Sequence, residues 1–257
     1  GTQSNFDTSG GFGPNQVSTI LGLGIFIFFV QLMLNSSNGI LQIINGGLVL
    51  FFAYRGLITF SRGGIYTGVA MILLLLAILY FQANFQTKPK IAGIIVLSFL
   101  ATLAVWSYSS IKTNGLLDKR YANQDAAGRE KKSQLSGREI LIESELKMFY
   151  ENPILGVGVG KNKELRETET GIQAASHNEI TRMLAEHGTL GIVGLLILLI
   201  TPLYLFAVDR QNILALSFFV FWLLTINHAA MRLSAPAFIY ALSLLKVYRE
   251  APAVHRK

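Results

Sequence analysis

Long apolar blocks separated by short polar breaks make up most of the chain. Six blocks approach the roughly 20 apolar residues that a helix needs to cross a bilayer, and they cover residues 17–34, 39–58, 65–82, 91–109, 189–208 and 212–231. A seventh, shorter block covers residues 235–248. We therefore predict an all-α polytopic membrane protein with about six to seven transmembrane helices and one large helical extracytoplasmic loop.

Composition agrees with this class. Of the 257 residues, 51% are apolar and only 14% are charged, which is typical of a membrane protein rather than a soluble domain. The net charge of +7 is spread over loops and a tail. Because no basic helix carries interleaved aromatic residues, we do not expect nucleic acid as a partner. The absence of cysteine excludes thiolate catalysis, disulfides and Cys-ligated zinc.

The blocks divide the chain into three predicted parts. Residues 1–109 carry the N-terminal transmembrane helices, and residues 189–257 carry the C-terminal ones with a tail. Residues 110–188 form the large loop, in which 12 Lys/Arg balance 12 Asp/Glu. The chain begins at Gly1 without an initiator Met or a signal-peptide pattern. We expect further helices upstream.

Orientation follows from alternation of the spans and the positive-inside rule. The rule places Lys88, Lys90, Arg210 and the tail "KVYREAPAVHRK" in the cytoplasm. The segments "GGFGPN" and "SRGG", the long loop and Arg232 then share the outer face. Arg62 of "SRGG" runs against the rule, but a long balanced loop can be translocated whatever its charge.

Two patterns follow one another in the long loop. Residues 110–136 have few apolar positions, which favours a solvated and mobile segment. "SGREILIESELKMFYENP" then shows helical spacing, with Ser136 as a candidate cap and Pro153 as the limit. Arg138 would lie in the first turn, where the helix dipole disfavours a cation. Either Arg138 has a function there or it is simply solvated.

A glycine-rich stretch, "PILGVGVGKNK", comes next. It is not a phosphate loop, because Asn162 stands where Ser or Thr is needed. It is not a dinucleotide fingerprint either, because no strand–helix unit surrounds it. Alternating Gly156, Gly158 and Gly160 predict a tight turn whose backbone approaches another segment closely.

The stretch "SHNEITRMLAEHG" precedes an apolar block. Ser176 and Glu179 fit a capping box, with Ser176 as the N-cap. Gly188 marks a break before the span. This assignment places His177 in the first turn, where the dipole favours a neutral imidazole and a nearby anion. His177 could accept a proton there, or it could belong to an ordinary capped helix and face water.

Several pieces of the sequence together resemble one family. "SGRE…NPILGVGVG…SHNEITRMLAEHGTLGIVG", preceded by "GGFGPNQVSTILGLG" and "LITFSRGG", is similar to the O-antigen ligase and polymerase superfamily. The resemblance implies a GT-C-type glycosyltransferase in the bacterial inner membrane. Such an enzyme transfers a glycan from an undecaprenyl-diphosphate carrier to an acceptor hydroxyl on the periplasmic side.

The resemblance also implies roles for individual residues. Arg62 and Arg138 match the two essential arginines, which would hold the diphosphate bidentately as its charge grows. His177 would be the general base of an inverting attack, which needs no metal and no cofactor. Glu179 and Glu186 are the second choice for the base. We predict substrate contacts at Arg182, Arg232, Asn178, Asn15, Gly158 and Gly160, with Arg166 and Arg55 as weaker candidates.

The acceptor stays open at this point. It could be a lipid A core sugar, as in a ligase, the growing glycan, as in a polymerase, or a protein side chain. We favour the ligase, with membrane lipids as the other partners. A transporter of lipid-linked glycans is the non-enzyme alternative, but it predicts inverted repeats and paired broken spans, which the sequence lacks.

Overall fold

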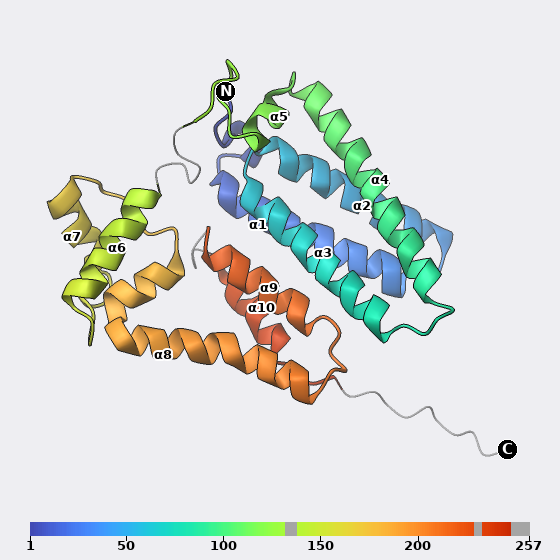
Figure 1. The fold of residues 1–257 in the computed structure, drawn as a ribbon. Helices are drawn as coiled ribbons and strands as arrows, with labels where there is room; N and C mark the ends of the chain where they lie inside the picture. The colour runs from blue at the N-terminus through green and yellow to red at the C-terminus, as the bar shows by residue number, and fades with distance from the viewer. Residues whose placement is uncertain (132–137, 229–232, 248–257) are drawn as a thin grey trace.

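The computed structural model describes residues 1–131, 138–228 and 233–247, and these ranges form helices and contain no β-strand. Figure 1 shows the long helices side by side, with a smaller helical unit at one end of the bundle. Within these ranges, five helices are long and apolar enough to cross a membrane: α1 (Pro14–Val30, continued by a π-helical turn at Gln31–Asn35), α2 (Gly39–Ile58), α3 (Arg62–Gln82), α4 (Lys88–Lys112) and α8 (Glu179–Val208).

The remaining helices are shorter. They are a 3-10 turn at Asp7–Ser9, α5 (Leu116–Tyr121), α6 (Glu139–Glu151), α7 (Lys161–Thr170), α9 (Ala215–Ile226) and α10 (Ser234–Ser243). The first five predicted spans are confirmed. The spans predicted at 212–231 and 235–248 correspond to apolar helices of 12 and 10 residues, shorter than the roughly 20 residues of a full span.

The bundle core lies between α1, α3, α9 and α10. Phe26 of α1, Met71 and Leu75 of α3 and Phe221 of α9 are fully buried in one apolar cluster. By contrast, α2 and α4 expose most of their apolar side chains. Since lipid is as apolar as these side chains, such faces are expected where helices meet the bilayer.

Small residues bring α1 and α3 into backbone contact. A Cβ on Gly22 would lie 2.0 Å from the carbonyl oxygen of Gly64, and one on Gly64 would lie 2.0 Å from that of Ser18. This packing of small residues four apart is common between membrane helices. It places the start of α3, with its "SRGG" sequence, against the start of α1.

One end of the bundle gathers the polar segments. Thr2 donates to the carbonyl of Gln124 at 2.8 Å, and Arg55 donates to that of Thr8 at 2.9 Å. The start of α3, the loop after α4 and the end of α9 meet at this end, whereas the start of α4 and the end of α8 lie at the other (Figure 1). The segments "GGFGPN" and "SRGG" and the start of the long loop, which were predicted to share one face of the membrane, therefore lie together at one end of the bundle.

The predicted solvated segment after α4 is partly folded. Residues 116–121 form helix α5, whose Leu117 is fully buried beside Phe60 and Ile65. Trp106 of α4 donates to Asp118 at 2.8 Å. The prediction of a solvated, mobile segment was wrong for α5, because its apolar side chains pack onto the end of the bundle.

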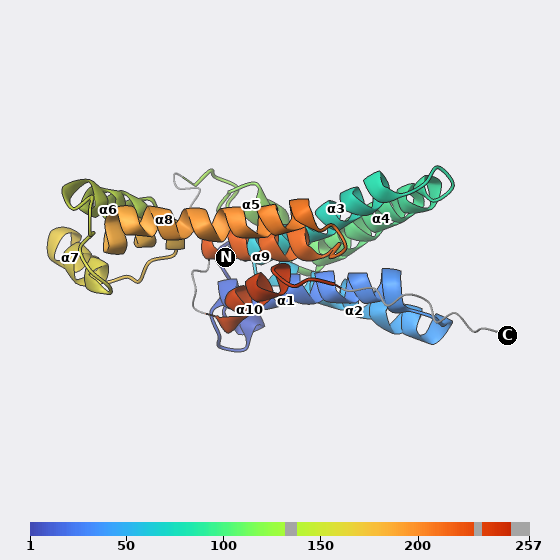
Figure 2. The ribbon, with the colours of Figure 1, turned by 90° about the horizontal axis from the view of Figure 1, so that it is seen from below.

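Helix α8 consists of two parts. Gly188 has φ 59° and ψ −136°, which breaks the helix between a polar part before it and an apolar part after it. The break predicted at Gly188 is confirmed. Figures 1 and 2 both show α6 and α7 beside the start of α8, at the end of the bundle that holds the polar segments.

Candidate functional site

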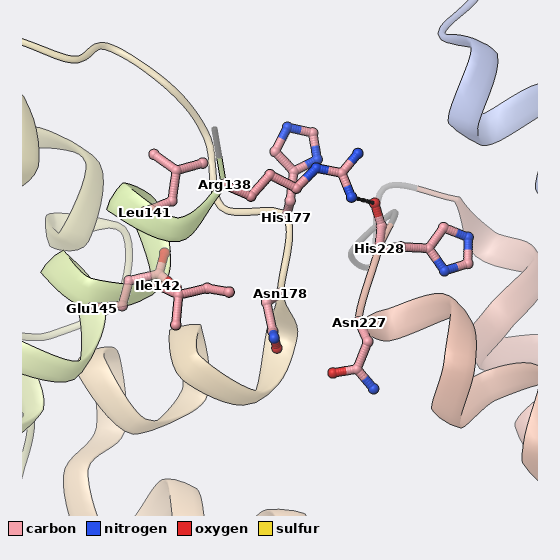
Figure 3. Close-up of a pocket in the computed structure, with 8 residues that line it drawn as sticks. All are labelled: Arg138, Leu141, Ile142, Glu145, His177, Asn178, Asn227 and His228. Atoms are coloured by element: carbon pink, nitrogen blue, oxygen red, sulfur yellow. Dashed lines mark hydrogen bonds between the residues drawn. The ribbon is translucent and has the colours of Figure 1, made fainter. Parts of the chain in front are cut away.

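A small cavity of about 100 Å³ opens where the starts of α6 and α8 meet the end of α9. Figure 3 shows Arg138 extending past His177 toward the backbone of His228. The cavity thus joins the two predicted loop residues with a segment from the C-terminal helices. Its lining consists of Arg138, Leu141, Ile142, Glu145, His177, Asn178, Asn227 and His228.

His177 lies just before helix α8. The N-cap is Asn178, whose side chain accepts from the backbone N–H groups of Ile180 at 2.9 Å and Thr181 at 3.4 Å. The predicted cap at Ser176 was wrong. The Ser176 hydroxyl instead bonds the backbone of Asn178 and shapes the turn before the cap. His177 is therefore outside the first helical turn, but it still lies at the positive end of the helix dipole.

Arg138 directly precedes α6. The helix runs from Glu139 to Glu151, so Arg138 occupies its N-cap position rather than the first turn. Its Nη1 donates to the carbonyl oxygen of His228 at 3.2 Å, which links α6 to the end of α9. The predicted cap at Ser136 lies outside the described residues, and the predicted end before Pro153 is confirmed.

Arg62 is the first residue of α3 and follows a tightly held turn. Phe60 has a positive φ of 56°. Ser61 donates to the Asn15 side chain at 2.7 Å and accepts from Ser18 at 2.8 Å. Asn15, predicted to contact substrate, thus holds the turn that presents Arg62.

The turn that presents Arg62 also reaches the cavity wall. A Cβ on Gly63 would lie only 2.5 Å from the His228 ring. The end of α9 therefore contacts both the Arg62 segment and Arg138. Long-range packing brings together the "SRGG" and "SGRE" motifs, which are about 75 residues apart in the sequence.

Arg120 is a cation at this end that the sequence reasoning missed. It is buried, and its Nε donates to the Phe60 carbonyl at 2.8 Å. Burial lowers the pKa of Arg120, and the nearby charges of Arg62 and Arg138 lower it further. Arg120 therefore lies close enough to Arg62 and Arg138 for their positive charges to act on it. The sequence feature that could have indicated a packed helix here is the pair Leu116 and Leu117, which makes α5 amphipathic.

A buried ion pair anchors the segment that carries His177. Arg166 of α7 and Glu145 of α6 are 0% and 1% exposed, with Nη2 and Oε1 2.6 Å apart. Arg166 also donates to Ser144 at 2.9 Å and to the Ala174 carbonyl at 2.5 Å. Thr181 donates to the second Glu145 oxygen at 2.6 Å. The pair therefore holds the chain on both sides of His177.

The surroundings of the Glu145 carboxyl are consistent with its role in this buried ion pair. Burial raises the pKa of the Glu145 carboxyl, while the hydrogen bond from Thr181 and the charge of Arg166 oppose that shift. Arg166, expected as a weak substrate contact, is enclosed in the protein and acts as a positioning residue. Glu145 was not predicted at all, because its partners come from other helices.

The glycine-rich turn packs on α8. Gly156, Gly158 and Gly160 have φ values of 68°, 92° and 78°. A Cβ on Gly156 would lie 2.5 to 2.6 Å from backbone atoms of Ala185 and Glu186. Glu186 accepts from the Gly160 N–H at 3.0 Å. The predicted close approach is confirmed, and it is an approach to α8 itself.

The sequence of the chain matches a known protein family. A family model described as O-antigen ligase matches residues 46–199, which is more than half of the chain. The chain belongs to the O-antigen ligase family. No curated protein and no solved structure matched it. The match includes Arg62, Arg138 and His177, and it ends within α8.

Membership of the O-antigen ligase family identifies the chain as a glycosyltransferase-type enzyme of the ligase and polymerase group, set in a membrane by several helices. Asn15 and Arg232 lie outside the matched region. Arg232 also lies outside the described residues.

Among the other predicted site residues that the structure describes, Asn178 alone lines the cavity. Arg182 pairs with Glu179 one turn away, at 2.5 Å, and its side chain is 38% exposed. Among the described residues, Gly158 and Gly160 are not in the cavity wall. Asn178 lines the wall but uses its side-chain oxygen as the helix cap. Glu186, a second choice for the base, is buried and occupied by the glycine-rich turn.

Within the ranges that the structure describes, no three His, Asp or Glu side chains are grouped as a metal ion would require. The donors nearest the cavity are guanidinium, imidazole and amide groups together with the single carboxylate of Glu145. The positive charge that the cavity lining offers an anion is the guanidinium of Arg138.

Proposed function

We propose that the chain transfers a glycan from an undecaprenyl-diphosphate carrier to an acceptor hydroxyl, as an O-antigen ligase in lipopolysaccharide assembly. The observation that carries the proposal is the cavity shared by Arg138 and His177, with the Arg62 turn in contact with its wall through Gly63 and His228. It supports a site that combines a base with fixed cations at one end of a membrane bundle.

The cations match the leaving group. As the glycosidic bond breaks, the electron pair moves to the diphosphate, whose negative charge grows. Guanidinium groups bind such oxygens bidentately, and groups that are already fixed stabilise the developing charge without reorganisation. We assign Arg138 and Arg62 to the diphosphate, and the buried Arg120 adds positive potential nearby.

His177 matches the acceptor. It would take the proton from the acceptor hydroxyl while the oxygen attacks the anomeric carbon with inversion. Help of this kind is worth about 100- to 10,000-fold in rate. The ion pair of Glu145 and Arg166 supports the role because it holds the backbone before and after His177.

We also propose that this end of the bundle faces the periplasm of a bacterial inner membrane. The start of α4, which carries Lys88 and Lys90, and the end of α8, which Arg210 follows, lie at the opposite end (Figure 1), and this suits the positive-inside rule. Residues 110–188 then form the periplasmic loop between the helices of 1–109 and those of 189–257. A lipid-linked donor would present its diphosphate at that membrane surface.

The test compares single variants in a transfer assay with an undecaprenyl-diphosphate-linked glycan and EDTA present. We expect His177→Ala to lose at least about 100-fold in rate. Removing one fixed charge donor, as in Arg138→Ala or Arg62→Ala, should also cost about 100-fold or more. His187→Ala is the matched control, because His187 lies on the same helix but outside the described lining of the cavity.

Each outcome bears on a separate part of the proposal. Full activity of His177→Ala would overturn the base, and loss of wild-type activity with EDTA would overturn metal independence. Lipid A core sugar, a second donor glycan and a serine peptide are offered as acceptors in parallel, so that a preference for the glycan would indicate a polymerase. Movement of intact donor across vesicles without transfer would favour a transporter.

A further inference from the structure

A group of large apolar side chains projects from the end of α6 and the glycine-rich turn. Tyr150, Ile154, Leu155 and Val159 are 70 to 75% exposed. They belong to the segment predicted to lie outside the membrane, where neighbouring α7 is almost wholly polar ("KNKELRETET"). Several large apolar side chains exposed within one short segment usually mark a surface that another phase or molecule covers.

The patch adjoins the point where α8 becomes apolar. The backbone N–H of Thr189 donates to the carbonyls of Pro153 at 2.8 Å and Ile154 at 3.2 Å. The next residues of α8 also expose apolar side chains, with Leu190 at 63% and Val193 at 53%. The exposed turn therefore continues the surface with which α8 would meet lipid.

The arrangement of the helices agrees with this position. Figure 1 shows α6 running across the direction of α8, beside the start of its apolar part, and Figure 2 also places α6 next to that start. An element beside the start of a span and crossing its direction lies along the membrane surface. Amphipathic elements at such a surface bury their apolar side about 5–10 Å into the headgroup and acyl boundary.

We propose that Tyr150, Ile154, Leu155 and Val159 insert into the lipid surface and anchor the loop on the membrane. The partner is the boundary between phospholipid headgroups and acyl chains. A second copy of the chain would leave the continuity with the exposed face of α8 unexplained, whereas lipid covers both surfaces at once.

The anchor sets the depth of the candidate site. Val157 and Gly158 donate to the carbonyls of Ala185 and Glu186 at 2.8 and 3.1 Å, so the turn is fixed to the helix that begins beside His177. A lipid-linked diphosphate lies at the same depth, in the headgroup layer. This consequence rests on the proposed function, but insertion of the turn does not.

The chain lacks cysteine, so that single introduced cysteines report on one position each. Leu155→Cys and Val159→Cys are labelled with a polarity-sensitive fluorophore in the full chain. Lys163→Cys and Glu167→Cys, on the exposed side of α7, are the matched controls. All four are reconstituted in phosphatidylcholine vesicles at less than one chain per vesicle, with and without lipid that carries a nitroxide near the headgroup.

We expect labels at 155 and 159 to emit at shorter wavelength and to be quenched several-fold more by nitroxide lipid than the α7 labels. We expect quenching by aqueous iodide to be several-fold weaker for them. Equal iodide quenching at all four positions would overturn the proposal. Protection from iodide without quenching by nitroxide lipid would overturn it too, because a protein surface would then cover the turn.

A second variant separates this result from the proposed function. Leu155→Cys is combined with His177→Ala, which should slow transfer at least about 100-fold and leave the quenching pattern unchanged. If the quenching pattern holds while His177→Ala alone retains transfer, the proposed base is wrong and the anchor stands. If transfer depends on His177 while the labels stay in water, the anchor is wrong and the base stands.

Discussion

Arg166→Met tests whether the buried ion pair holds the segment that carries His177. The substitution keeps much of the apolar length of the side chain but removes a guanidinium that is 0% exposed. Glu145 would lose the Arg166 Nη2 contact at 2.6 Å, and the Ala174 carbonyl would lose its donor at 2.5 Å. A buried carboxylate would then remain with its hydrogen bonds from Thr181 and Asn162 and without its cation.

The expected cost follows from this burial. Removing one partner of a buried ion pair typically costs about 3–5 kcal/mol, because the remaining charge is uncompensated. One factor of ten in an equilibrium constant corresponds to about 1.36 kcal/mol. Local opening of α6 and α7 should therefore become more frequent by about two to nearly four orders of magnitude. Neutralising Glu145 as well removes the uncompensated charge, so Arg166→Met with Glu145→Gln should recover at least about half of the loss.

Amide hydrogen exchange of α6 and α7 in detergent measures this opening directly. Lys161→Met is the matched control, because Lys161 forms an exposed pair with Glu164 at 2.9 Å, and such pairs contribute about 0–1 kcal/mol. If Arg166→Met exchanged no faster than Lys161→Met, Arg166 would not hold α6 and α7 together. If the double variant were as unstable as the sum of the two single ones, charge pairing would not be the cause.

Three further substitutions test other parts of the site. Gly188→Ala should lower the thermal unfolding midpoint, because φ 59° costs an L residue about 1–2 kcal/mol and the new Cβ would lie 2.6 Å from two carbonyl oxygens. The control Gly194→Ala should change the midpoint little, because a Cβ there makes only ordinary contacts. Arg120→Ala should reduce kcat/KM in the transfer assay about 10- to 100-fold by releasing the turn before α3, and Arg120→Lys should restore part of the activity. If Arg120→Ala had the same kcat/KM as the exposed control Arg129→Ala, the positioning role of Arg120 would be refuted. Asn178→Ala should lower the free energy of unfolding by about 1 kcal/mol and speed hydrogen exchange of the first amides of α8. Asn178→Asp should preserve the cap, so equal exchange rates in the two variants would argue against a capping role for Asn178.

Local pattern was sufficient to predict much of the fold. Five spans, the end of α6 before Pro153, the tight glycine turn and the break at Gly188 each depend on neighbouring residues. Helix formation and span length follow from runs of side chains along the chain, so the sequence alone can specify them. The same holds for the family, because its motifs keep their order in the sequence.

The tertiary structure decided which polar groups lie together and what each one does. The helix cap is Asn178 and not the predicted Ser176. Arg166 is a buried partner of Glu145, and Arg120 binds the turn before Arg62. Each of these contacts joins elements that are far apart in the sequence or depends on a turn geometry that two candidate caps could satisfy. A guanidinium on a helix looks the same in sequence whether it faces water, a carboxylate or a substrate. Only the packing of distant helices determines which of the three it meets.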